Sequence, residues 1–101
     1  MLARYIVIAI YGLDTFFGKD VIFLVFDQKN NSVYNYFESD SEAFKCCDEL
    51  NNKDLHYHIL IEAKATYNNN DININSPYIK ENDNIIIVIS EYLKIIIEKM
   101  I

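Results

Sequence analysis

The segment of residues 4–13 constrains the fold most, because it is apolar on both sides of a two-residue repeat. A strand with one face in water alternates apolar with polar side chains, whereas a strand inside a sheet is apolar on both sides. We therefore expect residues 4–13 to form an interior strand. Its two sides would be formed by Ile6, Ile8 and Ile10, and by Tyr5, Val7, Ala9 and Tyr11.

The same two-residue period predicts further strands. Residues 21–26 and 33–37 flank a polar stretch (27–32) in which an Asn can adopt the left-handed backbone of a turn, so they should form an antiparallel hairpin. Residues 55–63 predict a fourth strand with one face in water. The Asn-rich residues 64–76 predict a surface loop. On the fourth strand the inward side chains would be Leu55, Tyr57, Ile59, Ile61 and Ala63, and the outward ones His56, His58, Leu60 and Glu62.

Two helices are predicted from start signals and spacing. Ser39 followed by Glu42 forms a capping box that would open a helix near 40–51. Ser76-Pro77 would begin a C-terminal helix. Residues 85–89 are β-branched and alone would indicate a buried strand, but helical spacing continues to residue 100 and favours a helix. That spacing is kept by Ile79, Ile86, Ile89, Leu93, Ile96 and Met100.

Together these elements predict one α+β domain over residues 1–101, with a four-stranded, mainly antiparallel sheet in the order βββαβα. The strands would lie near 4–13, 21–27, 33–38 and 55–64. No apolar stretch is long enough to span a membrane, and the first strand lacks the cleavage site of a signal peptide. Because the two cysteines are adjacent and form no disulfide framework, we expect a cytoplasmic protein.

Acidic residues are concentrated in residues 38–54, in a chain whose formal charge is −6. This charge would repel a phosphate backbone, so we expect a protein partner with a basic surface and no direct nucleic-acid binding. The alternative is that the acids only keep a small domain soluble. The cluster contains Glu38, Asp40, Glu42, Asp48, Glu49 and Asp54, opposed by Lys45 and Lys53.

Catalysis is not predicted, because the chain has no Gly-rich phosphate loop and no arranged nucleophile. A reactive thiolate needs a positive setting, whereas Cys46 and Cys47 precede Asp48 and Glu49. We expect Cys47 to point inward and Cys46 to lie at the flank of the helix. Glu91, the one carboxylate in an apolar run, should face water. Neither an enzyme nor a cofactor is expected.

The nearest approach to a metal site is His56-x-His58. Alternation would place the two imidazoles side by side on a strand, with Glu62 on the same face, and nitrogen and carboxylate ligands suit zinc. A third well-placed ligand is missing, however. Two solvated histidines are therefore the preferred interpretation, with weak metal binding as the alternative.

Aromatic residues suggest one protein-contact surface. Tyr34 and Tyr36 should share a face of the third strand, where they would either pack in the core or bind a partner. Together with the acidic residues they define the predicted partner-binding surface. Its members are Asp40, Glu42, Asp48, Glu49, Tyr34 and Tyr36.

The C-terminal helix suggests a second contact surface. Ile87, Val88 and Ile95 lie outside the apolar stripe that would face the sheet, and covering them would favour a homodimer. Alternatively, the loop around Phe16-Phe17 or the Asn-rich loop covers this flank in the monomer. We treat the homodimer as the prediction.

These features favour a small acidic, non-enzymatic protein-binding module. The 17 Ile and 12 Asn reflect A/T-rich codons, a composition typical, by analogy, of phage, viral or mobile-element accessory proteins that inhibit host machinery. Such a protein could occupy the basic groove of a host nucleic-acid-handling protein in the host-cell cytoplasm. The alternatives are a homo-oligomeric structural protein and a weak metal-binding protein.

Overall fold

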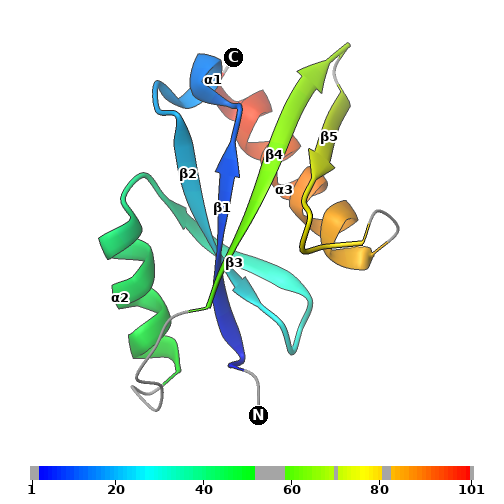
Figure 1. Ribbon diagram of the computed structural model, residues 1–101. Helices are drawn as coiled ribbons and strands as arrows, with labels where there is room; N and C mark the ends of the chain where they lie inside the picture. The colour runs from blue at the N-terminus through cyan, green and yellow to red at the C-terminus, as the bar shows by residue number, and fades with distance from the viewer. Residues whose placement is uncertain (1–2, 52–58, 70, 81–82, 101) are drawn as a thin grey trace.

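Strand β1 lies at the centre of a five-stranded sheet with the strand order β3-β2-β1-β4-β5 (Figure 1). The computed structural model describes residues 3–51, 59–69, 71–80 and 83–100. β1 is parallel to β4, and the other neighbouring strands are antiparallel. The elements are β1 (Tyr5–Tyr11), α1 (Asp14–Phe17), β2 (Val21–Asp27), β3 (Ser32–Phe37), α2 (Asp40–Leu50), β4 (Leu60–Asn68), β5 (Asp71–Asn75) and α3 (Asn84–Met100).

The predicted α+β class is confirmed, and the predicted sheet is corrected in two respects. Residues 64–76 are not a loop, because β4 continues to Asn68 and β5 turns Ile72 and Ile74 toward the core. The polar composition of this stretch concealed that alternation. The sheet is also mixed. Helix α2 ends beside Tyr5, at the end of the sheet where β1 begins, so β4 starts at the same end and runs parallel to β1.

Two turns depend on asparagines in the left-handed region. Asn31 has a φ of 52° between β2 and β3, which confirms the predicted hairpin and its turn. Asn69 has a φ of 51° between β4 and β5. Asparagine tolerates this backbone better than other non-glycine residues, so both hairpins close without glycine.

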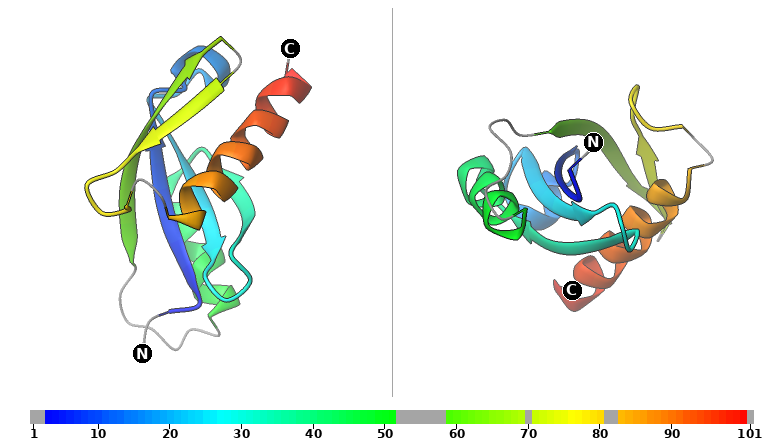
Figure 2. Two further views of the ribbon diagram at one scale, coloured as in Figure 1. Left: turned by 90° about the vertical axis from the view of Figure 1, so that its right-hand side faces the viewer. Right: turned by 90° about the horizontal axis from the view of Figure 1, so that it is seen from below.

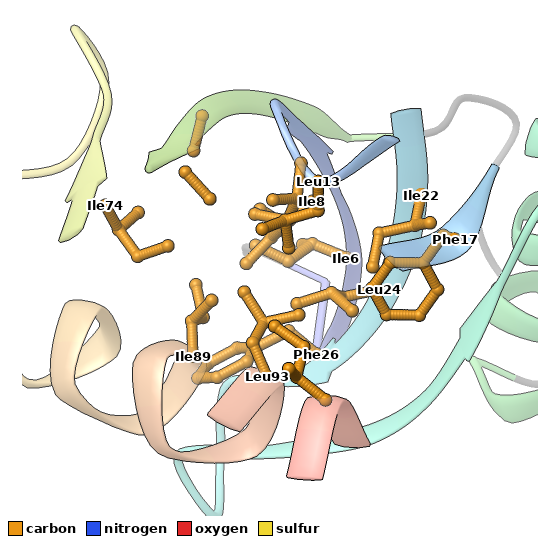
Figure 3. Packing of buried hydrophobic residues seen from close by; sticks show 14 of the residues in the cluster. Ile6, Ile8, Leu13, Phe17, Ile22, Leu24, Phe26, Ile74, Ile89 and Leu93 are labelled. Atoms are coloured by element: carbon orange, nitrogen blue, oxygen red, sulfur yellow. The ribbon is translucent and has the colours of Figure 1, made fainter. Parts of the chain in front are cut away.

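The larger core lies between the sheet and α3, which crosses from β5 to β3 (Figure 2). Side chains of β1, β2 and α3 converge there (Figure 3). The short helix α1, which we did not predict, closes one end of this core. The ring of Phe16 lies 4.9 Å from that of Tyr67, and the ring of Phe17 lies 5.7 Å from that of Tyr36.

Helix α2 covers the other face of the sheet, over β1, β2 and β3. Its buried Ala43 and Cys47 pack against Val7 and Val25. The interior strand predicted from the two-sided apolar pattern is therefore confirmed, because β1 is buried from Ile6 to Ile10.

Ser39 is the N-cap residue of α2, as predicted, but the capping box is not formed. The side chain of Ser39 makes no hydrogen bond to the helix backbone, and its Oγ lies 2.8 Å from Oγ of Ser41. The neighbouring carboxylate of Asp40 instead accepts from the backbone N–H of Ser41 at 2.7 Å. Competition among these polar side chains explains the difference.

The C-terminal helix is confirmed, although it begins at Asn84 and not at Pro77. Ser76 is used differently, because its hydroxyl donates to the carbonyl of Glu62 at 2.6 Å and accepts from the N–H of Tyr78 at 3.1 Å. These bonds stabilise a turn. The backbone N–H of Ile85 donates instead to the carboxylate of Asp83 at 3.2 Å, close to the start of α3.

The buried stripe of α3 is centred on Ile89, Leu93 and Ile97. Two predictions are corrected here. Val88 is half-buried and packs against the core, whereas Met100 is exposed because it lies in the last turn of the helix. In the described part of the chain, no helix is long and apolar enough to cross a membrane.

Candidate functional site

A hollow of about 530 Å³ lies where the edge strand β3 leads into α2. We call it the acidic groove, because Glu38 and Glu42 are exposed on its wall and Lys19 is the one basic residue that lines it. The chain folds this way because β3 ends at Phe37 and α2 starts three residues later. The lining residues are Lys19, Asn35, Tyr36, Phe37, Glu38, Ser39 and Glu42.

The predicted acidic cluster is only partly assembled at this groove. Asp40 and Glu42 lie in the first turn of α2, where negative charge also stabilises the positive end of the helix dipole. Glu49 is exposed at the far end of α2, and Asp48 is half-buried and engaged within the molecule. Lys53 and Asp54 lie outside the described residues. Of the predicted acidic cluster, the groove is therefore lined by Glu38 and Glu42.

Tyr34 and Tyr36 do not share a face, contrary to our prediction. The register between β2 and β3 shifts between Val25 and Phe26, so Tyr34 becomes the extra residue of a β-bulge. Tyr36 turns to the α3 side, with its ring 6.5 Å from that of Tyr92. Tyr34 is 55% exposed and contacts Tyr5, with 6.1 Å between ring centroids.

The carboxylate of Asp27 has a pKa well below its usual range, and its hydrogen-bond partners explain this. Arg4 makes two bonds to it, Nε to Oδ1 at 3.0 Å and Nη2 to Oδ2 at 3.0 Å. The backbone N–H groups of Lys29 and Asn30 donate to Oδ1 as well. The Arg4 hydrogen bonds, followed by these backbone bonds, lower the pKa of Asp27 from 3.8 to about 2. Asp27 thus ties the start of β1 to the β2–β3 turn.

The two cysteines are free thiols and lie as predicted. Cys47 is buried, and burial raises its pKa to about 12. Cys46 is half-buried, and burial together with the charge of Glu49 raises its pKa as well. Both thiols are therefore protonated at neutral pH, the weakly nucleophilic form of cysteine.

The remaining predicted site residues are Glu91 and the two histidines. Glu91 is exposed on α3, as expected. His56 and His58 lie outside the described residues, so the metal hypothesis for them stays a prediction. Within residues 3–51, 59–69, 71–80 and 83–100, no three His, Cys, Asp or Glu side chains are grouped so that they could hold a metal ion.

A second hollow, which we did not predict, lies on the sheet itself. It measures about 220 Å³ and is lined mainly by side chains of β1, β4, β5 and the turn after β5. This hollow was missed because residues 64–76 were predicted to be a loop. The alternation of Glu62, Lys64 and Thr66 with small apolar residues nevertheless indicates a strand with one polar face.

Comparison with known proteins adds no assignment: the chain matches no protein-family model, and no curated protein or solved structure shows significant similarity.

Proposed function

We propose that the protein is a non-enzymatic binding module that takes a basic segment of a partner protein into the acidic groove. The observation that supports this most is the position of Glu38 and Glu42, two exposed carboxylates on the wall of a hollow of about 530 Å³ beside an edge strand. A partner lysine or arginine could approach both carboxylates without being fully desolvated, which favours charge-assisted contacts.

An extended partner segment suits this groove better than a folded surface would. Residues 35–39 form one wall, and no strand among the described residues pairs with β3 on its outer side. The outer edge is partly protected, because the side chain of Asn35 accepts a hydrogen bond from the N–H of Tyr36 at 2.8 Å. We therefore assign affinity to side chains entering the groove and not to continuous strand pairing.

Nucleic acid is a poor ligand for the same surface, because the groove and the adjoining α2 face carry an excess of carboxylates. Composition and charge support, by analogy, a narrower proposal about the partner. In this narrower proposal the partner is a host nucleic-acid-handling protein, which the module would inhibit by holding one of its basic segments in the acidic groove.

The test is selection of binders from a displayed library of random peptides. We expect the selected peptides to be rich in Lys and Arg, to bind more weakly as salt rises, and to lose binding to a Glu38→Lys, Glu42→Lys variant. The matched control is Glu91→Lys, Glu98→Lys, which makes the same charge change on α3 and should keep binding. Selection of neutral or acidic peptides, or equal binding by the groove variant, contradicts the proposal.

A third variant tests how far the binding surface extends. Reversal of Asp40, Asp48 and Glu49 should weaken binding less than reversal of the groove pair, because Asp48 is engaged internally and Glu49 lies at the other end of α2. Equal losses would indicate a broad acidic surface instead of a groove.

Self-association through α3 is the second candidate function. Ile87 and Ile95 are each 54% exposed, although the same helix buries a stripe of apolar side chains on its other side. They flank Glu91 on the outer side of the helix, so two copies could cover them mutually. Val88, the third residue predicted for this surface, is half-buried and packs against the core, so it would contribute less than Ile87 and Ile95.

A further inference from the structure

In the described part of the chain, no helix packs on the half of the sheet formed by β4 and β5 on the side opposite α3. Helix α2 packs over β1, β2 and β3, and the outward residues of β4 are exposed in the described chain. Three of the exposed large apolar residues, Tyr11, Leu60 and Tyr78, belong to this region. The hollow of about 220 Å³, which we call the sheet-face hollow, is lined by Tyr11, Glu62, Ala63, Lys64, Asn75, Pro77 and Tyr78.

The strand register places the polar side chains of the sheet-face hollow in a row across the sheet. Tyr11 pairs with Lys64 across β1 and β4, and Lys64 pairs with Asn75 across β4 and β5. Paired residues project from the same face of a sheet, so the phenol, ammonium and amide groups come from neighbouring positions. Glu62 is two residues before Lys64 and shares that face, with its Oε1 3.5 Å from the hydroxyl of Tyr11.

Tyr78 forms an aromatic wall held in place by its own turn. The Ser76 hydroxyl bridges the carbonyl of Glu62 and the N–H of Tyr78, at 2.6 and 3.1 Å, and Pro77 restricts the backbone between them. Tyr78 is nevertheless 70% exposed. The turn restrains the backbone of Tyr78, so its exposed ring projects beside the polar hollow.

The charges of the hollow limit the kind of ligand. Glu62 and Lys64 are its two formal charges, of opposite sign, and they form no ion pair; between described residues the one ion pair joins Arg4 to Asp27. A strongly anionic or cationic ligand would meet a like charge. The lining also offers hydrogen-bond donors and acceptors together, since Lys64 donates, Glu62 accepts, and the amide and phenols do both.

We infer that the sheet-face hollow is a binding site for a neutral saccharide. A pyranose ring has a C–H face that can stack on the ring of Tyr78 and a rim of hydroxyls that can bond to Glu62, Lys64 and Asn75. Because the hollow is open, the ligand stays partly hydrated, which suits a polyhydroxylated molecule and not an apolar one. This site lies apart from the acidic groove and does not depend on the proposed function.

The test is a titration of the ¹⁵N-labelled protein with neutral oligosaccharides of glucose, mannose, xylose and N-acetylglucosamine, each followed by amide chemical shifts. We expect saturable shifts with at least one of them, confined to β4, β5 and residues near Tyr11 and Tyr78. Tyr78→Ala should weaken that binding about tenfold, a loss of roughly 1.4 kcal/mol, while Tyr78→Phe retains most of it. Tyr34→Ala, which removes an exposed tyrosine elsewhere, is the matched control and should bind normally.

Several outcomes overturn the inference. They are the absence of saturable shifts with every sugar, shifts at another surface, and undiminished binding by Tyr78→Ala. A free amino acid serves as a zwitterionic probe and a Lys-rich peptide as a basic one. If either perturbs the sheet-face hollow and no sugar does, the ligand is charged and the saccharide assignment is wrong.

Discussion

The side chain of Asn51 binds the backbone of Tyr5 through both of its polar atoms. The Tyr5 N–H donates to Oδ1 of Asn51, and Nδ2 of Asn51 donates to the Tyr5 carbonyl, each at 3.1 Å. Among the described residues, the hydrogen bonds from the β4 side to β1 begin at Val7, whose N–H donates to the carbonyl of Ile59 at 3.0 Å. The amide of Asn51, the C-cap residue of α2, therefore takes the place of a neighbouring strand and joins the helix to the central strand.

Asn51→Ala should destabilise the protein by about 1–3 kcal/mol, because it leaves two partly buried backbone groups of Tyr5 without these partners. Urea unfolding measures the change. Asn73→Ala, at an exposed position of β5, is the control and should cost much less. Equal losses in the two variants would show that the Asn51 bonds add little.

The stability that Asp27 contributes should be lost in acid. Its pKa in the folded protein is lowered from 3.8 to about 2, so folding favours the ionised form and the benefit is complete above the ordinary value. As pH falls from about 4 to about 2, the benefit disappears. The difference in unfolding free energy between the wild type and Asp27→Asn should therefore shrink over this range. A constant difference would contradict the role of the Arg4 pair.

Gly12→Ala should be far more destabilising than Gly18→Ala. Both glycines have positive φ, 97° and 67°, so both substitutions carry backbone strain of about 1–2 kcal/mol. At Gly12 the new Cβ would also collide with the carbonyl oxygen of Ala65, whereas nothing lies within 4 Å at Gly18. Backbone strain is common to the two variants, so the difference between their melting temperatures measures the cost of the collision. Similar melting temperatures would mean that β4 shifts freely.

The two thiols should differ in reactivity. Burial raises the pKa of Cys47 to about 12, and Cys46 is more accessible. At mildly alkaline pH we expect an alkylating reagent to modify Cys46 slowly and Cys47 only when the protein unfolds. Peptide mapping after timed alkylation, with Cys46→Ser as the control, identifies the modified residue. Rapid modification of Cys47 in the native protein would contradict its burial.

Substitutions on the outer and inner sides of α3 should have different effects. Ile87→Glu, Ile95→Glu should abolish self-association and leave unfolding free energy nearly unchanged, because both side chains are exposed. Val88→Glu should instead destabilise the fold, because Val88 packs against the core. Sedimentation equilibrium at micromolar concentration and urea unfolding measure the two effects. A strictly monomeric wild type refutes the homodimer.

Patterns within a few residues determined much of the fold. Apolar side chains on both sides of β1 required burial on both faces, and both core clusters draw on it. Helical spacing identified α3 in spite of the β-branched run at its start. The turn at Asn31 also followed from residue chemistry. Such features are predictable because the periods of helix and strand decide which neighbours share a face.

Only the tertiary structure decided which strands pair and which distant residues meet. The parallel pairing of β4, the bulge that separates Tyr34 from Tyr36, and the bond between Asn51 and Tyr5 depend on residues far apart in sequence. The sheet-face hollow arises in the same way across β1, β4 and β5, whereas the acidic groove is lined mainly by the short segment of residues 35–42. A local period fixes the face on which a side chain lies, but its partner across the sheet is set by packing of the whole chain, which no short segment encodes.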